Sequence, residues 1–525
     1  MKKFLVSNQA LLIGTVFLLL TLLKSLWFTS IPASFHPDEL AYIVAAQAVS
    51  LTGTSLAGDW NPWRLTPFHQ AYAELPTHLQ TIGFALSPNP FVGARLISFI
   101  LGSTLPLALG LIAYYLYNSK GLGVVVLLVS AANPWIWQNS RFEFDILYSV
   151  WFYACGTALY LGLPAKWKWS SAGVFIIGFF QYQGYKVFFP LLIAALVVYT
   201  FFTQPRNNRQ LHISQSIFAL ACAAVFIVYV LVLLPRQSSA VRISLDSTIS
   251  SSSLSKYGQL ADTERRLSFV SPLMTLFSNK LSILFIILLR RFGTAFDFNN
   301  LFVEGMHNTS SFSVTSHGMF YLLDSLLILY GVYIGLSHKK WRKPTILMLG
   351  LASLSLAPIF IAQTEWFTLR MGWSYSMMLL FVGLGFWSIW QKGTVFKIGL
   401  IGVYALSIAS FGYHYYYRYP LYSLEGTWME DRVLSSYLHR IAQTDVSIRA
   451  EDPLPQISSI LAYNWHSVTQ ADIITVRERL TPHSTQWNNI RISDECIDVT
   501  QFPFEHTTVL APSVGACKDQ IDELE

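Results

Sequence analysis

Long apolar runs, separated by short polar or Pro/Gly-containing segments, recur along most of this chain. The first runs from Leu11 to Phe28. At about 1.5 Å rise per residue, a helix of that length crosses a hydrocarbon core of roughly 30 Å. Of the 525 residues, 53% are hydrophobic and only 12% are charged, so most of the chain is expected to be solvated by lipid. The sequence predicts an all-α polytopic membrane protein.

About eleven transmembrane helices are expected from these runs. They lie near residues 10–30, 91–117, 121–137, 143–163, 169–183, 186–203, 214–234, 316–337, 344–362, 370–390 and 395–413. Lys2 and Lys3 before the first run, and the basic segment Lys339–Lys343, indicate which connections stay in the cytoplasm. We therefore expect a plasma (inner) membrane protein with a cytoplasmic N-terminus and with the loops 31–90 and 235–315 and the C-terminal tail on the outer face.

The chain divides into two parts of different composition. Residues 1–413 carry the apolar runs and an excess of basic groups, whereas residues 414–525 are polar and acidic. Within the tail, a helical pattern at Trp428–Ala442 and strand-like runs at 446–448, 473–476 and 508–510 predict a small extracytoplasmic α/β domain. Cys496 and Cys517 in this tail could form a disulfide outside the cytosol.

The two long outer loops contain candidate interfacial helices. Leu40–Ala48 in the first loop is amphipathic, which is typical of a helix that lies along the membrane surface. In the second loop, residues 279–301 combine an apolar run with Arg290 and Arg291. We interpret them as interfacial helix and loop, because a twelfth crossing would move the basic segment Lys339–Lys343 to the outer face.

Two adjacent carboxylates, Asp38 and Glu39, follow Pro37 just beyond the first apolar run. One interpretation is structural: a helix begins at Pro37 and carries acids in its first turn, where the backbone dipole favours them. The other is functional, because a carboxylate at the membrane surface can act as a general base toward a hydroxyl group. His36 beside them could ligate a metal, but one histidine and two carboxylates are weak evidence for a site. A divalent metal is possible and no cofactor is certain.

Further charged residues stand at the expected outer ends of other spans. Arg141 and Asp145 are four residues apart, which predicts that they share one helix face, with Glu143 pointing elsewhere. They either form a structural ion pair or have a functional role, because the expected topology brings them to the same membrane face as Asp38. Lys186 and Arg370 either extend toward lipid headgroups or bind a lipid phosphate. His69, Glu74 and His78 do not fit one helix face and are expected to be exposed loop residues rather than metal ligands.

Several common motifs are missing from the sequence. It contains no Walker loop, dinucleotide-binding glycine motif, nucleophile elbow or Cys-x-x-Cys zinc pattern. Nucleotide-driven transport and soluble-cofactor redox chemistry therefore lose their usual support, and nothing predicts a nucleic-acid partner.

Four features together resemble the GT-C membrane glycosyltransferases, in particular the protein O-mannosyltransferase and aminoarabinose-transferase-like group. They are the pair Asp38-Glu39 after the first span, Ser140-Arg141 with Asp145 at the fourth, the His-Tyr-Tyr-Tyr-Arg-Tyr-Pro run that ends at Pro420, and the outer C-terminal domain. The resemblance implies a polyprenyl-phosphate-linked sugar donor and an acceptor on the outer face. It also implies Asp38 as general base and Arg141 as a cation facing the phosphate.

This chemistry requires few protein groups. Polyprenyl phosphate leaves readily once cations hold its charge, so the enzyme needs a base for the acceptor hydroxyl and cations for the phosphate. We expect transfer of a hexosyl or pentosyl group with inversion, with Glu39 orienting the acceptor or Asp38, and Trp60, Trp63 and Trp135 stacking on the sugar or isoprenoid. The acceptor could be a protein, a glycolipid or a cell-envelope glycan.

Three alternatives remain open at this stage. A multispanning transporter or lipid flippase would also carry charged residues in its spans. A non-enzymatic sensor or scaffold would use the spans only as an anchor. A GT-C enzyme that transfers a whole oligosaccharide would be expected to need a divalent metal and a longer outer groove.

Overall fold

The computed structural model describes most of the chain. The described residues are 2–56, 58, 73–203, 208–234, 250–270, 273–306, 313–314, 316–361, 370–423, 429–440, 445–450, 453–481, 483–494 and 507–510. Trp60, Trp63, His69, Cys496 and Cys517 lie outside them.

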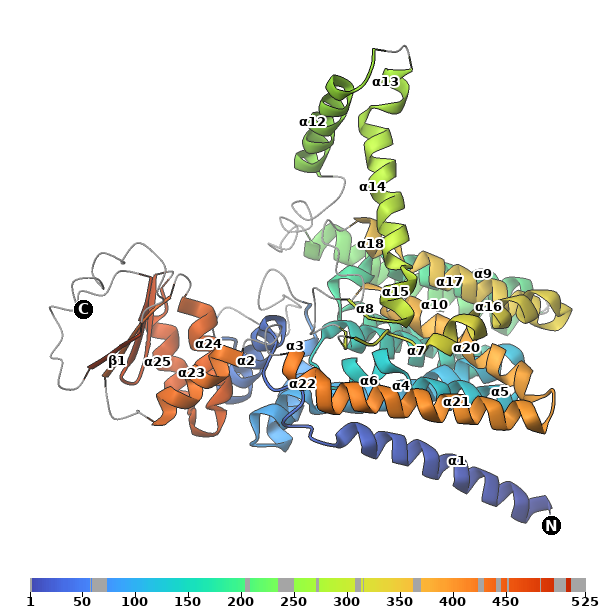
Figure 1. Ribbon diagram of the computed structural model, residues 1–525, viewed down its shortest axis with the longest axis horizontal. Helices are drawn as coiled ribbons and strands as arrows, with labels where there is room; N and C mark the ends of the chain where they lie inside the picture. Colours follow the sequence, from blue (N-terminus) through green and yellow to red (C-terminus); the bar gives the residue numbers. More distant parts are fainter. Residues whose placement is uncertain are drawn as a thin grey trace.

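Each of the eleven apolar runs contains a helix. The helices are α1 (Lys2–Ser25), α4 (Pro90–Tyr117), α5 (Lys120–Ala131) followed by α6 (Pro134–Asn139), α7 (Asp145–Gly162), α8 (Ser171–Phe179), α9 (Phe188–Thr203), α10 (Arg209–Val228), α16 (Leu322–Ser337), α17 (Lys339–Leu354) followed by α18 (Ala357–Ile361), α20 (Gly372–Trp390) and α21 (Thr394–Tyr413). They run roughly side by side in one bundle (Figure 1). This arrangement is that of an integral membrane protein.

The helices differ in how much of their apolar surface is buried inside the bundle. Among the described residues, five helical segments are long and apolar enough to cross a membrane: Pro90–Tyr117, Arg209–Leu233, Lys339–Ile361, Gly372–Trp390 and Thr394–Leu421. The segment at α20 is 83% buried, whereas those at α10 and α21 are only 17% buried. α20 therefore forms the centre of the bundle, while α10 and α21 expose apolar side chains around it. The count of eleven crossings stays a prediction.

Two glycines allow the central helices to approach closely. A Cβ on Gly331 of α16 would lie 2.2 Å from the Phe381 carbonyl oxygen, and one on Gly385 of α20 would lie 2.2 Å from that of Leu327. Both distances are below any van der Waals contact. Small residues at the α16–α20 crossing therefore bring the two backbones together, as is common between membrane helices.

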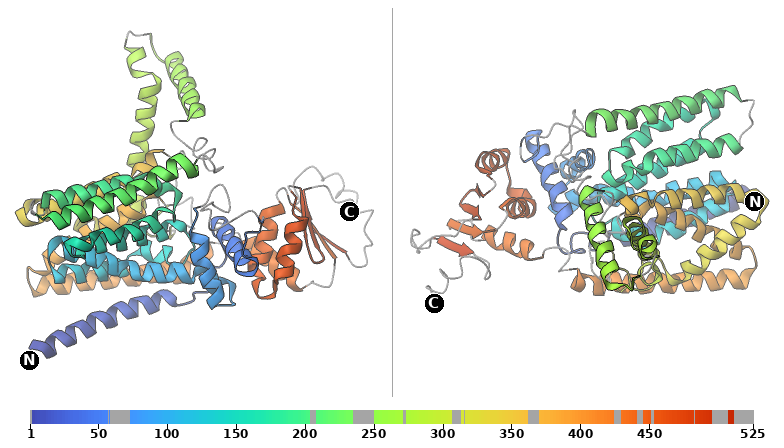
Figure 2. Two further views of the ribbon diagram at one scale, coloured as in Figure 1. Left: turned by 180° about the vertical axis from the view of Figure 1, so that it is seen from behind. Right: turned by 90° about the horizontal axis from the view of Figure 1, so that it is seen from above.

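Two further helices, α2 (Pro37–Thr52) and α3 (Pro76–Leu86), lie between the bundle and the C-terminal domain (Figures 1 and 2). α2 covers the stretch Leu40–Ala48, which was expected to be amphipathic. Eight of those nine residues are buried, including Ile43 and Ala46 at 0% exposure. The amphipathic expectation is wrong, because α2 packs on protein on several sides.

The C-terminal domain contains a small sheet and three helices: α23 (Met429–Arg440), α24 (Pro453–Tyr463) and α25 (Gln470–Arg479). Its strands are β1 (Asp445–Arg449), β2 (Ser484–Trp487), β3 (Ile490–Ser493) and β4 (Thr507–Leu510), in the order β2-β3-β1-β4. β1 pairs in parallel with β3 and β4, and β2 pairs with β3 as an antiparallel hairpin. The expected helix and two of the expected strands are present.

The third expected strand, residues 473–476, is wrong. These residues lie in α25, where the Thr469 side chain caps the helix and Asp472 returns a bond to the Thr469 backbone. The capping box starts a helix in spite of the β-branched residues that follow. Ile473 and Val476 are then buried on one side of it.

A helical arm projects from the side of the bundle. It consists of α12 (Ser251–Leu267), α13 (Met274–Phe277) and α14 (Lys280–Ala295), and α15 (Phe298–Phe302) follows at its base. α14 runs roughly perpendicular to the bundle helices, near the end that carries the C-terminal domain (Figure 1). Residues 279–301 are therefore helical, as expected, and α14 does not run parallel to the spanning helices.

Candidate active site

The first turn of α2 supports the candidate carboxylates. Pro37 occupies the first helical position, as the sequence predicts for a helix start, and His36 is the N-cap. The His36 Nδ1 accepts the Asp38 backbone N–H at 3.1 Å, while Glu39 Oε2 accepts the His36 backbone N–H at 2.8 Å. This reciprocal pair fixes the first turn of α2, which carries Asp38.

Glu39 is fully buried, and both oxygens of its carboxylate accept hydrogen bonds. Its side chain is 0% exposed and forms an ion pair with Arg95, with Arg95 Nε 3.1 Å from Oε1. Oε1 also accepts the Glu143 backbone N–H at 2.8 Å. This burial and the ion pair with Arg95 disfavour the expectation that Glu39 contacts the acceptor, and its catalytic role stays a prediction. Its contacts support the other expected role, which was to position Asp38.

Asp38 has the opposite surroundings. Its side chain is 33% exposed, and its charge acts on Asp145 at the start of α7. Asp145 Oδ2 accepts the Tyr42 hydroxyl at 2.6 Å, and the same hydroxyl oxygen accepts the Ala73 backbone N–H at 3.2 Å. The fold thus brings together two carboxylates that are more than one hundred residues apart in sequence.

Arg141 does not take the expected place. α7 begins at Asp145, so Arg141 precedes the helix and the two residues do not share a helix face. Its guanidinium is buried and donates to four backbone carbonyls, those of Lys24, Leu26, Trp27 and Ile31. These five bonds use all five donors of an arginine, so Arg141 has none left for a phosphate. The expectation of a phosphate-facing Arg141 is corrected: it anchors the end of α1 and the chain that follows.

Glu143 lies beneath the two carboxylates. It is 0% exposed, and its Oε2 accepts the Ser98 hydroxyl at 2.5 Å. The expectation that Glu143 points away from the helix face shared by Arg141 and Asp145 does not apply, because α7 begins only at Asp145. Glu143 contacts the interior and not the surface, and its expected supporting role stays a prediction.

Lys186 is paired with a second carboxylate. Its Nζ lies 2.5 Å from Glu74 Oε1 and 4.1 Å from the centre of the Tyr229 ring. Glu74 was expected to be an exposed loop residue, yet it is only 1% exposed. The expectation is wrong because Lys186, far away in sequence, compensates its charge in the interior. Lys186 remains near the site, since its charge also interacts with Asp145.

Arg370 stands at the start of α20 and is partly exposed. Its side chain interacts with the Tyr182 hydroxyl, and Tyr182 in turn lies within electrostatic range of both Asp38 and Asp145. Arg370 is therefore a cation close to the two carboxylates. Of the other two cations expected to face a phosphate, Arg141 is enclosed by backbone carbonyls and Lys186 is paired with Glu74.

His36 behaves as a capping residue. Burial lowers its pKa below the ordinary value of 6.5, and this effect outweighs the neighbouring charges of Asp38 and Glu39, which raise it. The neutral ring can accept the Asp38 N–H through Nδ1. Within the described residues there is no group of three His, Cys, Asp or Glu side chains that could hold a metal ion.

Sequence reasoning missed Arg95, Tyr42 and Ser98. Arg95 is fully buried inside α4, and a lone arginine in an apolar span is a signal that could have been followed to a buried acid. Tyr42 lies four residues after Asp38 on the same helix, and this spacing also indicates a shared face. Ser98 gives no comparable signal, because a serine in a membrane helix needs no partner outside its own backbone.

The fold and site define a polytopic helical membrane protein with an acidic and cationic centre at one end of its bundle. No model of a known protein family matches the chain, and no curated protein matches it. Similar solved structures include two GT-C membrane glycosyltransferases.

The first is archaeal oligosaccharyltransferase AglB from Archaeoglobus fulgidus, solved with an inhibitory peptide and a dolichol-phosphate, at 10% identity, 88% coverage of this chain and a TM-score of 0.48. This chain spans just under two thirds, 64%, of AglB. The second is ArnT from Cupriavidus metallidurans bound to undecaprenyl phosphate, at 14% identity, with 91% of this chain and 88% of that chain covered and a TM-score of 0.48.

Proposed function

We propose that the chain is a membrane glycosyltransferase that moves a sugar from a polyprenyl-phosphate-linked donor to an acceptor on the outer face of the membrane. The observation that carries the proposal is the difference among the four acids of the site. Asp38 is one-third exposed, whereas Glu39 and Glu143 are fully buried and Asp145 is bonded to Tyr42. Asp38 is the carboxylate that an acceptor hydroxyl can reach.

The proposed reaction is a single displacement with inversion. The Asp38 carboxylate takes the proton of the acceptor hydroxyl while the acceptor oxygen forms a bond to the anomeric carbon. The bond from that carbon to the phosphate oxygen breaks, and the polyprenyl phosphate departs with the electron pair. Arg370 would stabilise the charge on this leaving group, and the Asp145–Tyr42 bond would keep the neighbouring carboxylate in position. The acceptor is a protein, a glycolipid or a cell-envelope glycan.

The arrangement of charges supports an outer-face site. The site, α2 and the C-terminal domain lie at one end of the bundle, whereas the N-terminus and the α16–α17 and α20–α21 junctions lie at the other (Figure 1). Those junctions carry Lys339, Lys340, Arg342, Lys343 and Lys392. Basic connections remain in the cytoplasm, so the site end would face outward.

The test is sugar transfer from radiolabelled polyprenyl-phosphate hexoses and pentoses by membranes that contain the full chain. Asp38→Asn should lower the rate at least about a hundredfold, in the range that loss of a general base produces. Asp262→Asn, an exposed acid on the distant helix α12, is the matched control and should leave the rate unchanged.

Three outcomes would contradict the proposal. Full activity in Asp38→Asn at equal protein level would remove Asp38 as the base. Consumption of a lipid-linked oligosaccharide instead of any monosaccharide donor, with loss of activity in chelator, would favour the oligosaccharide-transferring alternative. If no donor of either kind is consumed, a transporter or flippase becomes the better hypothesis.

A further inference from the structure

The projecting arm has two helices with different surfaces. α12 packs on α14 through Tyr257, Ala261 and Ile283, which are 5%, 2% and 5% exposed. The Arg265 side chain fixes the tip, because its Nε donates to the Ser278 carbonyl oxygen at 2.7 Å and a guanidinium nitrogen lies 3.4 Å from Asp262. The arm is therefore a joined pair of helices.

The side of α14 that faces away from α12 is apolar and exposed. It presents Leu281, Phe285, Leu289, Phe292 and Phe296, which are 76%, 64%, 58%, 45% and 37% exposed. At about 100° per residue, these five positions fall in a sector of roughly 80°. The residues that contact α12, Ile283, Leu284 and Ile287, fall on the opposite side of the helix. We call the five residues the apolar stripe.

The apolar stripe is on the side of the arm that is turned toward the spanning helices. In Figures 1 and 2, α12 lies on the side of α14 toward the C-terminal domain, and α14 runs across the direction of the spanning helices. The face of α14 opposite α12 is therefore turned toward the zone that the spanning helices occupy. In that zone α16 exposes Leu322, Leu326 and Leu329, at 59%, 64% and 69%. The stripe thus continues a surface that is already suited to lipid.

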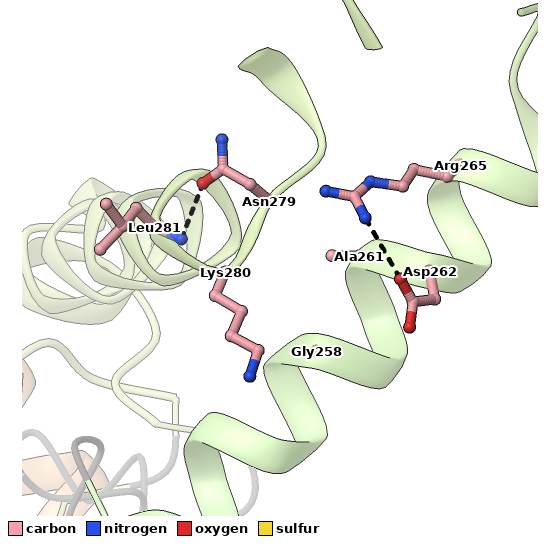
Figure 3. Close-up of a pocket in the computed structure, with 7 residues that line it drawn as sticks. All are labelled: Gly258, Ala261, Asp262, Arg265, Asn279, Lys280 and Leu281. Atoms are coloured by element: carbon pink, nitrogen blue, oxygen red, sulfur yellow. Dashed lines mark hydrogen bonds and ion pairs between the residues drawn. The ribbon is translucent and has the colours of Figure 1, made fainter. Parts of the chain in front are cut away.

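The arm is also basic. Residues 250–291 contain the six cations Lys256, Arg265, Arg266, Lys280, Arg290 and Arg291 and only the two acids Asp262 and Glu264. A cavity of about 400 Å³ opens between α12 and α14. Arg265 and Lys280 extend into it from different helices, with Leu281 of the stripe at its edge (Figure 3). The arm therefore combines an apolar stripe on one side with an excess of cationic groups on the rest of its surface, as do helices that lie on anionic membranes.

We propose that the arm lies flat on the outer surface of the bilayer, with the apolar stripe in the boundary between headgroups and acyl chains and with α12 above it in water. Anionic phospholipids are the favoured occupants, because residues 250–291 carry six cations and only two acids. A helix of 16 residues extends the protein's contact with the membrane by about 24 Å beyond the bundle. The proposal requires a membrane-spanning bundle and does not depend on sugar transfer.

The test is the depth of a fluorophore on the full chain reconstituted in phosphatidylcholine vesicles with and without phosphatidylglycerol. Phe285→Cys and Leu289→Cys place an environment-sensitive label on the stripe. Gln259→Cys and Thr263→Cys place it on exposed positions of α12 that face away from α14 and serve as matched controls. All four are made in a chain with Cys496 and Cys517 replaced by serine, and the labelled parent chain gives the background of Cys155 and Cys222.

Labels on the stripe should be quenched at least threefold more by nitroxide on the lipid acyl chain than labels on α12, and iodide in water should show the reverse order. Phosphatidylglycerol should increase the quenching by lipid. Equal access of iodide to both sets would overturn the proposal. Protection of the stripe from iodide and from lipid nitroxide alike, stronger at higher protein density, would also overturn it and would assign the stripe to a second copy of the chain.

Discussion

Asp38 and Glu39 are neighbours in sequence but have unlike surroundings, because one residue of helix rotates the side chain by about 100°. Asp38 points to the accessible side of the site. Glu39 points into the interior and meets Arg95, whose guanidinium also donates to the carbonyl oxygens of Pro32 and Ser34. The two interpretations of the acidic pair are thus divided between the residues: Glu39 belongs to the structure, and Asp38 is the proposed base.

This division predicts that Glu39→Gln acts through stability. Removing one partner of a buried ion pair leaves the Arg95 charge uncompensated, which costs about 3–5 kcal/mol. The variant should give less folded protein and a lower melting temperature in detergent, whereas Asp38→Asn should melt like the wild type. Glu264→Gln, exposed on α12, is the control. If Glu39→Gln melts normally and has lost all transfer, Glu39 and not Asp38 is the base.

At this scale the sequence reveals local contacts more readily than distant ones. The helix start at Pro37 was predictable because the proline, the cap and the acids are adjacent. The cage around Arg141 was not, since its acceptors are backbone carbonyls more than one hundred residues earlier in the chain. The same holds for Glu74, whose burial depends on Lys186. Sequence spacing carries no information about partners that only the tertiary fold brings together.

Among the elements, α2 determines the position of the candidate base. Its N-terminus is held by the neutral His36 ring, which accepts the Asp38 backbone N–H. A protonated imidazole has no acceptor lone pair, so protonation would break this cap. The stability of α2 is thereby linked to pH.

We expect the melting temperature of the purified chain to fall below about pH 6.5. Because burial lowers the His36 pKa in the folded state, the unfolded chain takes up this proton at a higher pH than the folded chain. The stabilisation by the neutral His36 ring is therefore complete above the pKa of His36 in the unfolded chain. It is lost as the pH falls toward the lower pKa of His36 in the folded chain, with a slope of at most about 1.4 kcal/mol per pH unit. His36→Asn keeps an N-cap acceptor that does not titrate.

Melting temperatures between pH 7.5 and 5.5 check this prediction. The His36→Asn curve should decline less than the wild-type curve as the pH falls, and His439→Asn, exposed on α23, should leave the wild-type slope unchanged. Parallel curves for His36→Asn and wild type would show that the cap does not titrate in this range.

The type of an element could be predicted from the sequence where a long apolar run determines it. Where a helix cap determines the type, the prediction was less successful. Every apolar run contains a helix, because long apolar segments in lipid must satisfy their own backbone hydrogen bonds. In the tail, the Ile-Ile-Thr-Val run of α25 favours a strand by composition, but Thr469 and Asp472 start a helix there. Trp135, expected to stack on substrate, is 1% exposed and instead contacts Tyr375 edge-on within the bundle.

In the whole molecule, the C-terminal domain and α2 share one hydrophobic core. Leu40 and Ile43 of α2 belong to the same cluster as Ile457 and Ile460 of α24. The domain also binds both ends of the segment that carries Asp38. The Tyr463 hydroxyl accepts the Phe35 backbone N–H at 2.8 Å, before the helix begins. A domain of this size gains its stability partly from α2, and α2 gains a fixed position in return.

At the other end of α2, Arg477 of α25 makes the connection. Its guanidinium donates to the Ser55 carbonyl oxygen and to the Thr54 hydroxyl, each at 2.8 Å, just beyond the last turn of the helix. Arg477→Ala should loosen α2 and lower sugar transfer roughly tenfold, because losing hydrogen bonds from a charged group costs about 1.5–3 kcal/mol. Arg479→Ala, two residues away and exposed, is the matched control.

Amide hydrogen exchange separates this effect from a general loss of stability. In Arg477→Ala the amides of α2 should exchange faster while those of α20 in the bundle centre keep their wild-type rates, since local opening follows the contacts that are lost. Faster exchange in both helices would indicate that the whole fold is weakened. Unchanged exchange in α2 would show that the C-terminal domain does not position Asp38. The domain would then be expected to act on the acceptor instead.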